Sequence, residues 1–165
     1  MRPFKGKLIS CVKQRRRLPN GNVVNLEIIK HPGATLIVPF LNKNTIIFIR
    51  QFRPVINSYL YELPAGTLDK GETPARCARR EIIEETGYAA GKMTLLGKIF
   101  PVPGYSTEII TIFKAEKLEK RKKDTQADEI IRVCVLSRPR VKKLFKKGLI
   151  KDAKTICALA FCGRL

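Results

Sequence analysis

Short apolar runs separated by turn residues make up most of the hydrophobic pattern, and they predict a strand-rich fold. The runs are rich in β-branched and aromatic residues and end at clusters of Gly, Pro or Asn, which is typical of strands in a packed sheet. Pro19-Asn20-Gly21 separates two of them as the turn of a hairpin would. The predicted strands cover residues 7–12, 22–29, 34–40, 45–50, 58–63, 93–100, 109–114 and 130–136.

The segment 74–86 has the signals of a helix instead. Thr73 precedes it as an N-cap residue, Pro74 suits the first helical position, and Gly87 suits the position after the last turn. Apolar side chains at helical spacing predict a buried face. This face would consist of Ala75, Ala78 and Ile82.

Two further helices are predicted at 139–147 and 152–161, separated by Gly148. Strands interleaved with helices indicate an α/β fold, in which helices cover both faces of a mixed sheet. The chain has 165 residues, of which 44% are apolar. This size and composition fit one domain spanning residues 1–165.

The net charge of +19 is unevenly distributed along the chain. The segment 62–88 holds six acidic and four basic residues and carries −2, so the remaining residues carry +21. An acidic island of this kind can hold cations, while basic surroundings attract anionic substrates. We therefore do not expect nucleic acid to be the main ligand.

Other sequence features argue against a membrane or secreted protein. No apolar run approaches the roughly 20 residues of a membrane span, and no apolar segment precedes the basic cluster at residues 13–17. The five cysteines are scattered without C-x-x-C spacing, so we expect buried, reduced thiols. These features predict a cytoplasmic protein that does not associate with membranes.

Three glutamates form an acidic stripe on the predicted helix 74–86. Glu81, Glu84 and Glu85 stand at positions i, i+3 and i+4, within about 80° of arc on the helix surface. Like charges at this spacing destabilise a helix, but a hard divalent cation such as Mg²⁺ would turn the repulsion into a binding site. Arg80 lies four residues before Glu84 and can form an ion pair that orients it. Taken alone, the stripe would favour a solvated acidic face over a metal site.

The wider pattern around this stripe has fixed spacing. It runs as Gly66-x5-Glu72-x7-Arg80-Glu81-Ile82-x-Glu84-Glu85-x-Gly87-Tyr88. This pattern resembles the Nudix box, G-x5-E-x7-R-E-U-x-E-E-x-G-U with U a bulky apolar residue, at every fixed position. Tyr88 is aromatic where an aliphatic residue is more common. The resemblance implies a Nudix-type α/β/α sandwich with a mixed β-sheet between helices.

The resemblance also implies a role for each residue of the box. Gly66 would permit the backbone turn that brings the Ala65 carbonyl to a metal ion. Glu81 and Glu85 would be the main carboxylate ligands of Mg²⁺, with Mn²⁺ as an alternative. Glu84 would be a further ligand or a partner of the ligands, and Glu84 and Glu85 would take part in catalysis. Glu72 and Arg80 would chiefly tie the loop to the helix, and Gly66 and Gly87 would be further structural residues of the box.

Segments on either side of the box extend the match. They are His31-Pro32-Gly33-Ala34, Arg50-Gln51-Phe52-Arg53-Pro54, Tyr61-Glu62-Leu63-Pro64-Ala65-Gly66 and Pro103, which falls 16 residues after Gly87. They resemble the ADP-ribose pyrophosphatase subfamily. The resemblance implies Mg²⁺-dependent cleavage of ADP-ribose to AMP and ribose 5-phosphate, or of a related nucleoside-diphosphate sugar.

Candidate substrate-binding residues follow from the same resemblance. Arg53 matches a position that contacts substrate, and a guanidinium suits a diphosphate or its sugar. An ion pair between Arg53 and Glu62 is the structural alternative, while Glu62 and Glu108 are further candidates for substrate binding. His31 is expected to be a turn residue. Leu26 stands where many relatives have arginine, which leaves other nucleotide sugars open, such as GDP-mannose or ADP-glucose.

A general base is expected in the loop before the last predicted strand. Glu129 is the first candidate, Asp128 the second, and Glu108 a third candidate from a different loop. An exposed loop acid without a catalytic role is the alternative for Glu129.

The subfamily resemblance also implies a homodimer, in which N-terminal strands within about residues 1–30 are exchanged between protomers. The same strands could equally complete the sheet of a monomer. Two other functions stay open. The first is a Nudix enzyme that acts on dinucleoside polyphosphates, modified nucleotides or RNA 5′ ends. The second is a non-catalytic module that binds nucleotide sugars or nucleic acid, against which the intact acidic stripe argues.

Overall fold

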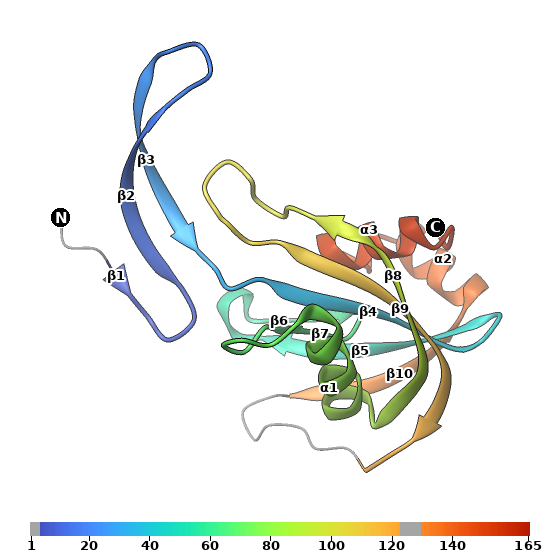
Figure 1. Cartoon of the computed structure of the whole chain (residues 1–165). Coiled ribbons are helices and arrows are strands. Elements are labelled where there is room, and N and C mark those ends of the chain that lie inside the picture. The colour runs from blue at the N-terminus through green and yellow to red at the C-terminus, as the bar shows by residue number, and fades with distance from the viewer. Residues whose placement is uncertain (1–3, 123–129) are drawn as a thin grey trace.

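The computed structural model describes residues 4–122 and 130–165 of the chain. In this part of the chain, the main sheet has the strand order β10-β5-β4-β9-β8, with β6 paired to β5 and β7 paired to β4 (Figure 1). Its strands are β4 (Ala34–Asn42), β5 (Thr45–Arg53), β6 (Ser58–Glu62), β7 (Ala65–Thr67), β8 (Tyr88–Ile99), β9 (Ile110–Lys120) and β10 (Ile131–Ser137). Strands β4 and β9 are parallel, and the other pairs in this sheet are antiparallel. The predicted mixed sheet is therefore confirmed.

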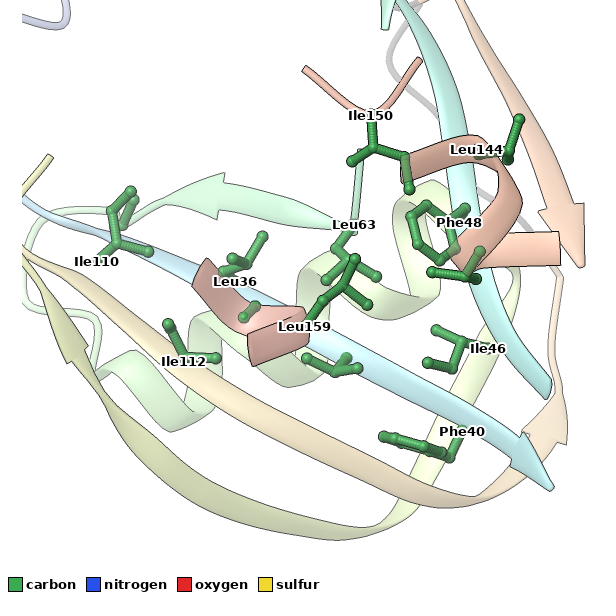
Figure 2. Packing of buried hydrophobic residues seen from close by; sticks show 14 residues of the cluster. Leu36, Phe40, Ile46, Phe48, Leu63, Ile110, Ile112, Leu144, Ile150 and Leu159 are labelled. Carbon is green, nitrogen blue, oxygen red and sulfur yellow. The ribbon is translucent and has the colours of Figure 1, made fainter. Parts of the chain in front are cut away.

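Helices cover both faces of this sheet. On one face, α1 (Pro74–Thr86) packs Ala78 and Ile82 against Ile37 of β4. On the other face lie α2 (Arg138–Lys146) and α3 (Ala153–Phe161), and Figure 2 shows Leu36, Leu63 and Leu159 gathered in this layer. Residues 34–40 are buried without interruption, because alternate side chains of a central strand enter two different covered layers. The arrangement confirms the predicted α/β/α sandwich.

The ends of α1 follow the sequence signals. The Thr73 hydroxyl accepts a hydrogen bond from the backbone N–H of Arg76, and Gly87 adopts the left-handed conformation with a φ of 73°. The predicted buried face is wrong at one position, because Ala75 is exposed and Cys77 is buried instead. Cys77 points at β7, and residues two apart on a helix diverge by about 200°, so Ala75 faces solvent.

The N-terminal strands form a separate three-stranded sheet that stands away from the main sheet (Figure 1). It consists of β1 (Phe4–Lys5), β2 (Ser10–Arg17) and β3 (Val23–Lys30). The Ile29 N–H donates to the Tyr105 carbonyl at 2.8 Å, and the Thr107 N–H donates to the Ile29 carbonyl at 3.0 Å. These bonds anchor the last residues of β3 to the loop before β9. The predicted exchange of these strands between protomers stays a prediction.

Two further sequence expectations concern thiols and membrane spans. All five cysteines are unbridged, but only Cys77 is fully buried. The expectation of buried thiols is wrong for Cys11, which is exposed on the projecting strand β2.

A short 3-10 helix, η1 (Pro54–Ile56), follows β5. No helix within residues 4–122 and 130–165 is long and apolar enough to cross a membrane.

Replacing Ile82 tests how α1 is held on the sheet. The Ile82→Ala variant should lower the free energy of unfolding by about 2–5 kcal/mol, because the change leaves a cavity in a fully buried cluster. Urea denaturation measures the loss. The matched control on the same helix is Arg76→Ala, at an exposed position, where the change should stay within about 0.5 kcal/mol. Equal effects of the two substitutions would contradict this packing.

Candidate active site

A cavity of about 770 Å³ lies between strands β5 and β7, helix α1 and the start of the chain. Six residues singled out from the sequence meet in its lining: Arg53, Ala65, Gly66, Arg80, Glu81 and Glu85. Lys7, Leu8, Pro32, Gln51 and residues 67–70 complete the lining. Residues of the sequence motif and of three flanking segments are thus brought together in a single cavity.

Glu81 occupies space that a side chain at position 66 would need. A Cβ built on Gly66 would overlap the Glu81 carboxylate, so this position excludes every residue larger than glycine unless Glu81 moves. Gly66 is not among the glycines with positive φ. Its observed role is therefore the close approach of the β7 backbone to a carboxylate, and the backbone turn that would bring the Ala65 carbonyl to a metal ion stays a prediction.

Glu85 ties helix α1 to the same loop. Glu85 is only 2% exposed, and its Oε2 accepts a hydrogen bond from the backbone N–H of Ala65 at 2.9 Å. Glu81 is likewise buried, with 9% exposure. Two buried carboxylates therefore face Ala65 and Gly66 of strand β7 from successive turns of one helix. The role of the Ala65 carbonyl as a metal ligand stays a prediction.

Arg80 is the main cationic partner of the acidic stripe. Its Nη1 lies 2.6 Å from Glu81 Oε1 and 3.0 Å from Glu84 Oε2, so the predicted Arg80–Glu84 ion pair is present. Its Nε and Nη2 donate to the two carboxylate oxygens of Glu72 at 3.1 and 3.0 Å. A further hydrogen bond runs from Nη2 to the Thr67 carbonyl at 3.4 Å. One guanidinium therefore connects the loop before the helix to the helix face.

The electrostatics of this connection keep its groups charged. The hydrogen bonds with Arg80 lower the pKa of Glu72 to about 2, and the hydrogen bond with Glu72 raises the pKa of Arg80 above its ordinary value. A glutamate with a depressed pKa stabilises the folded state fully above its ordinary pKa. This stabilisation is lost progressively as the pH falls from the ordinary pKa of glutamate toward about 2, while the ion pair itself persists in mild acid.

Cys77 is a residue of this region that the sequence did not single out. Its thiol donates to the carbonyls of Gly66 and Thr67 at 3.7 and 3.5 Å, beneath the loop. Burial raises the pKa of the Cys77 thiol to about 12. The thiol is therefore neutral and helps to pack the loop against the helix, which is a role that only the folded arrangement reveals.

Arg53 faces the cavity from the opposite wall and is held by Glu62. Its Nε and Nη2 donate to Glu62 Oε1 and Oε2 at 2.7 and 2.6 Å. Burial alone would raise the pKa of Glu62, but the hydrogen bonds and charges of Arg53 and Lys154 outweigh it and lower the pKa. Glu62 is 1% exposed and does not line the cavity, which favours the structural alternative for this residue. Lys154, 92 residues further along the chain, was not anticipated.

Gln51 is a second unanticipated residue of the cavity wall. It lies two residues before Arg53 on β5, is 7% exposed and lines the cavity. In the part of the chain that the structure describes, its Oε1 is buried without a hydrogen-bond partner. A buried amide oxygen of this kind is costly to leave unpaired, so it is a candidate acceptor for a ligand donor.

The remaining candidates lie elsewhere. Glu84 and Glu108 are absent from the cavity lining, and Glu108 Oε1 lies 3.9 Å from His31 Nδ1. His31 Nδ1 accepts a hydrogen bond from the Gly33 N–H at 3.0 Å, as expected of a turn residue. Glu129 and Asp128 lie outside the described residues.

The donor set fits a hard divalent cation by type. Mg²⁺ takes carboxylate and carbonyl oxygens, and Glu81, Glu85 and Ala65 line one cavity. Within residues 4–122 and 130–165, however, no three His, Cys, Asp or Glu side chains are grouped closely enough to hold an ion. Glu81 and Glu84 instead both form ion pairs with Arg80, whose guanidinium supplies the positive charge between them.

Comparison with known proteins agrees with this arrangement. Residues 30–159 match the family model of the NUDIX domain. The chain is 37% identical over 160 residues to the ADP-ribose pyrophosphatase of Bacillus subtilis (strain 168), covering 96% of this chain and 86% of that protein. It is 34% identical over 152 residues to the GDP-mannose pyrophosphatase of Escherichia coli O1:K1 / APEC, covering 82% and 79% respectively.

A solved structure with the same fold is described as the crystal structure of an ADP compounds hydrolase. It is 22% identical in sequence and superposes with a TM-score of 0.81, covering 99% of this chain and 93% of that chain. The domain match, the relatives and the complete motif lead to one conclusion: the chain belongs to the Nudix family.

Proposed function

We propose that the protein hydrolyses the diphosphate bond of ADP-ribose or a related nucleoside-diphosphate sugar in a reaction that needs Mg²⁺. The products would be AMP, or another nucleoside monophosphate, and a sugar phosphate. The observation that carries the proposal is one cavity that joins the buried carboxylates of Glu81 and Glu85 to the guanidinium of Arg53. The names of two similar pyrophosphatases support the substrate class.

In this proposal Ala65, Glu81, Glu84 and Glu85 hold the metal, which is Mg²⁺ or, as an alternative, Mn²⁺. A bound divalent cation neutralises charge on diphosphate oxygens and lowers the pKa of a bound water. Glu81, which is paired with Arg80 in this structure, would then have the metal ion as a cationic partner. The two hydrogen bonds of Arg80 to Glu72 do not involve these ligands, so they could hold the loop to the helix in either case.

Arg53 is the proposed contact for the diphosphate or its sugar. Its bidentate pair with Glu62 uses two of the five N–H donors of a guanidinium, so the group can keep this pair while donating to a ligand. Glu62 then acts through Arg53 and not on the substrate. Leu26, on β3, does not line the cavity, so ADP-ribose, GDP-mannose and ADP-glucose are all compared as substrates.

Glu129 is the proposed general base, with Asp128 as the second candidate. Both precede β10, which pairs with β5 through Ile131 and Gln51, and Gln51 lines the cavity. Glu108, also named for substrate binding and as a third base, lies beside His31 and not in the cavity lining. This difference favours Glu129.

We also propose a homodimer with exchanged N-terminal strands and a cytoplasmic location. The N-terminal sheet leaves Phe4 and Leu8 60% and 54% exposed, and a second copy would cover such apolar side chains. Leu8 lines the cavity together with Lys7, so this segment has a place near bound substrate. The five unbridged cysteines fit a reducing compartment.

The substrate class is tested with a panel of compounds incubated with and without Mg²⁺. The panel holds ADP-ribose, GDP-mannose, ADP-glucose, a diadenosine polyphosphate and a 5′-triphosphate RNA, and chromatography separates the products. We expect AMP and ribose 5-phosphate from ADP-ribose, at the highest specificity constant and only with metal. Preference for the polyphosphate or the RNA would overturn the substrate class, and turnover of no compound would favour a non-catalytic binding module.

The Glu85→Gln variant tests the proposed metal site. Glutamine can still accept the hydrogen bond from Ala65 but carries no charge, so the fold should persist while kcat falls by roughly a hundredfold or more. Turnover and thermal unfolding are measured on the same preparation. The control is Glu119→Gln, at an exposed glutamate on β9, which should leave both unchanged. A fully active Glu85→Gln enzyme would refute the assignment.

The Gly66→Ala variant tests the contact between the loop and Glu81. Its methyl group would displace the Glu81 carboxylate, so we expect at least a tenfold loss of kcat/KM and a higher Mg²⁺ concentration for half-maximal activity. A magnesium titration of activity gives both values. The control is Gly104→Ala, because a Cβ there meets open space. Unchanged magnesium dependence in Gly66→Ala would contradict the close approach.

A further inference from the structure

We propose that Lys154, on α3, is a positioning residue that holds Glu62 in place and thereby aims the Arg53 guanidinium into the cavity. Lys154 lies outside the Nudix box and does not line the cavity. The inference rests on the proposed function, because it assigns Arg53 to substrate. It extends the site to a helix on the face of the sheet opposite α1.

Four charged side chains form a continuous chain from the cavity wall to α3. Arg53 donates to both oxygens of Glu62, and Lys154 Nζ donates to Glu62 Oε2 at 2.5 Å. Lys154 Nζ also donates to Asp152 Oδ1 at 2.8 Å. Positive and negative groups alternate, so each interior member has an opposite charge on either side.

Burial makes the Lys154 contact consequential. The Glu62 side chain is 1% exposed, whereas the Lys154 and Arg53 side chains are 20% and 39% exposed. A carboxylate removed from water depends on its partners for compensation. Without Lys154, Glu62 Oε2 would keep only Arg53 as a cationic partner. The Glu62 carboxylate would then be free to move together with the Arg53 guanidinium when that guanidinium binds a ligand. With Lys154, Glu62 Oε2 has a second cationic partner, which belongs to a helix that does not line the cavity.

The first turn of α3 is itself fixed by further bonds. Asp152 caps the helix by accepting from the Thr155 N–H at 3.0 Å and from the Thr155 hydroxyl at 2.6 Å. The Thr155 hydroxyl oxygen accepts from the Leu63 N–H at 2.9 Å. Leu63 directly follows Glu62 and lies two residues before Ala65, where β7 begins. The first turn of α3, from which Lys154 extends, is therefore hydrogen-bonded to Leu63, the residue next to the Glu62 that Lys154 contacts.

A purely structural role would be the docking of α3, and it predicts different kinetics. A positioning role requires that loss of Lys154 weakens substrate binding through Arg53, so kcat/KM falls mainly because KM rises. It also requires that the loss is absent once Arg53 has been removed. A docking role predicts lower thermal stability with normal kinetics at temperatures at which the variant is folded.

The test compares Lys154→Met, Lys154→Arg, Arg53→Ala and the double variant Arg53→Ala/Lys154→Met with the wild-type enzyme on ADP-ribose. We expect Lys154→Met to lower kcat/KM by roughly tenfold to a hundredfold, and Lys154→Arg to restore most of it. In the Arg53→Ala background, Lys154→Met should change kcat/KM by less than about twofold. The control is Lys114→Met, which removes a paired lysine from β9 and should leave kcat/KM unchanged.

A second readout does not depend on turnover. The Arg53 Nε–H donates to a buried carboxylate, so its signal in a nitrogen-15 NMR spectrum should exchange slowly with water. We expect faster exchange in Lys154→Met and slow exchange again in Lys154→Arg. Equal exchange rates in all three proteins would overturn the positioning role, as would additive losses of kcat/KM in the double variant. If the wild type turns over no substrate, the proposed function fails, while the NMR comparison still decides whether Lys154 orders Arg53.

Discussion

The contact of Arg80 with the acidic face of α1 is the interaction on which the site depends. Three glutamates within five residues repel one another, and two of them are buried, so the helix needs an internal cation to fold without a metal. Arg80 supplies it to Glu81 and Glu84, and its pair with Glu72 brings the preceding loop along. The same guanidinium therefore offsets the repulsion between Glu81 and Glu84 and holds the loop at Glu72 beside the helix.

Strand β4 connects this helix to the other wall of the cavity. Ile37 packs toward α1, while Leu36 and Val38 pack toward α3, so both helices are positioned by one buried strand. Ala65, the first residue of β7, pairs with Leu36 of β4, and its N–H donates to Glu85. The proposed metal ligands and the proposed substrate contact therefore belong to a single packed unit, in which neither helix can shift without disturbing the loop between them.

The sequence predicted those features that depend on neighbouring residues. The helix α1 begins and ends at the predicted residues, because Thr73, Pro74 and Gly87 act within one turn of its ends. The fixed spacing of the Nudix box likewise placed Glu81, Glu85 and Gly66 in one site. The sequence did not predict Cys77 as the buried residue in place of Ala75, because the direction from which β7 approaches the helix is a property of the whole fold. The exposure of Cys11 depends in the same way on a sheet that projects from the main body.

The contacts that join distant segments were beyond sequence reasoning for a clear physical reason. Lys154 and Glu62 are 92 residues apart, and a lysine near a helix N-terminus looks like any solvated surface charge. Lys154 reaches Glu62 only because α3 packs against β4 and its first turn is hydrogen-bonded to the backbone at Leu63. A motif with local spacing can specify the metal-binding chemistry of one wall, because its residues share a loop and a helix. The opposite wall is assembled from β5, β6 and α3, so its selectivity can change through any of three separate segments while the motif stays intact.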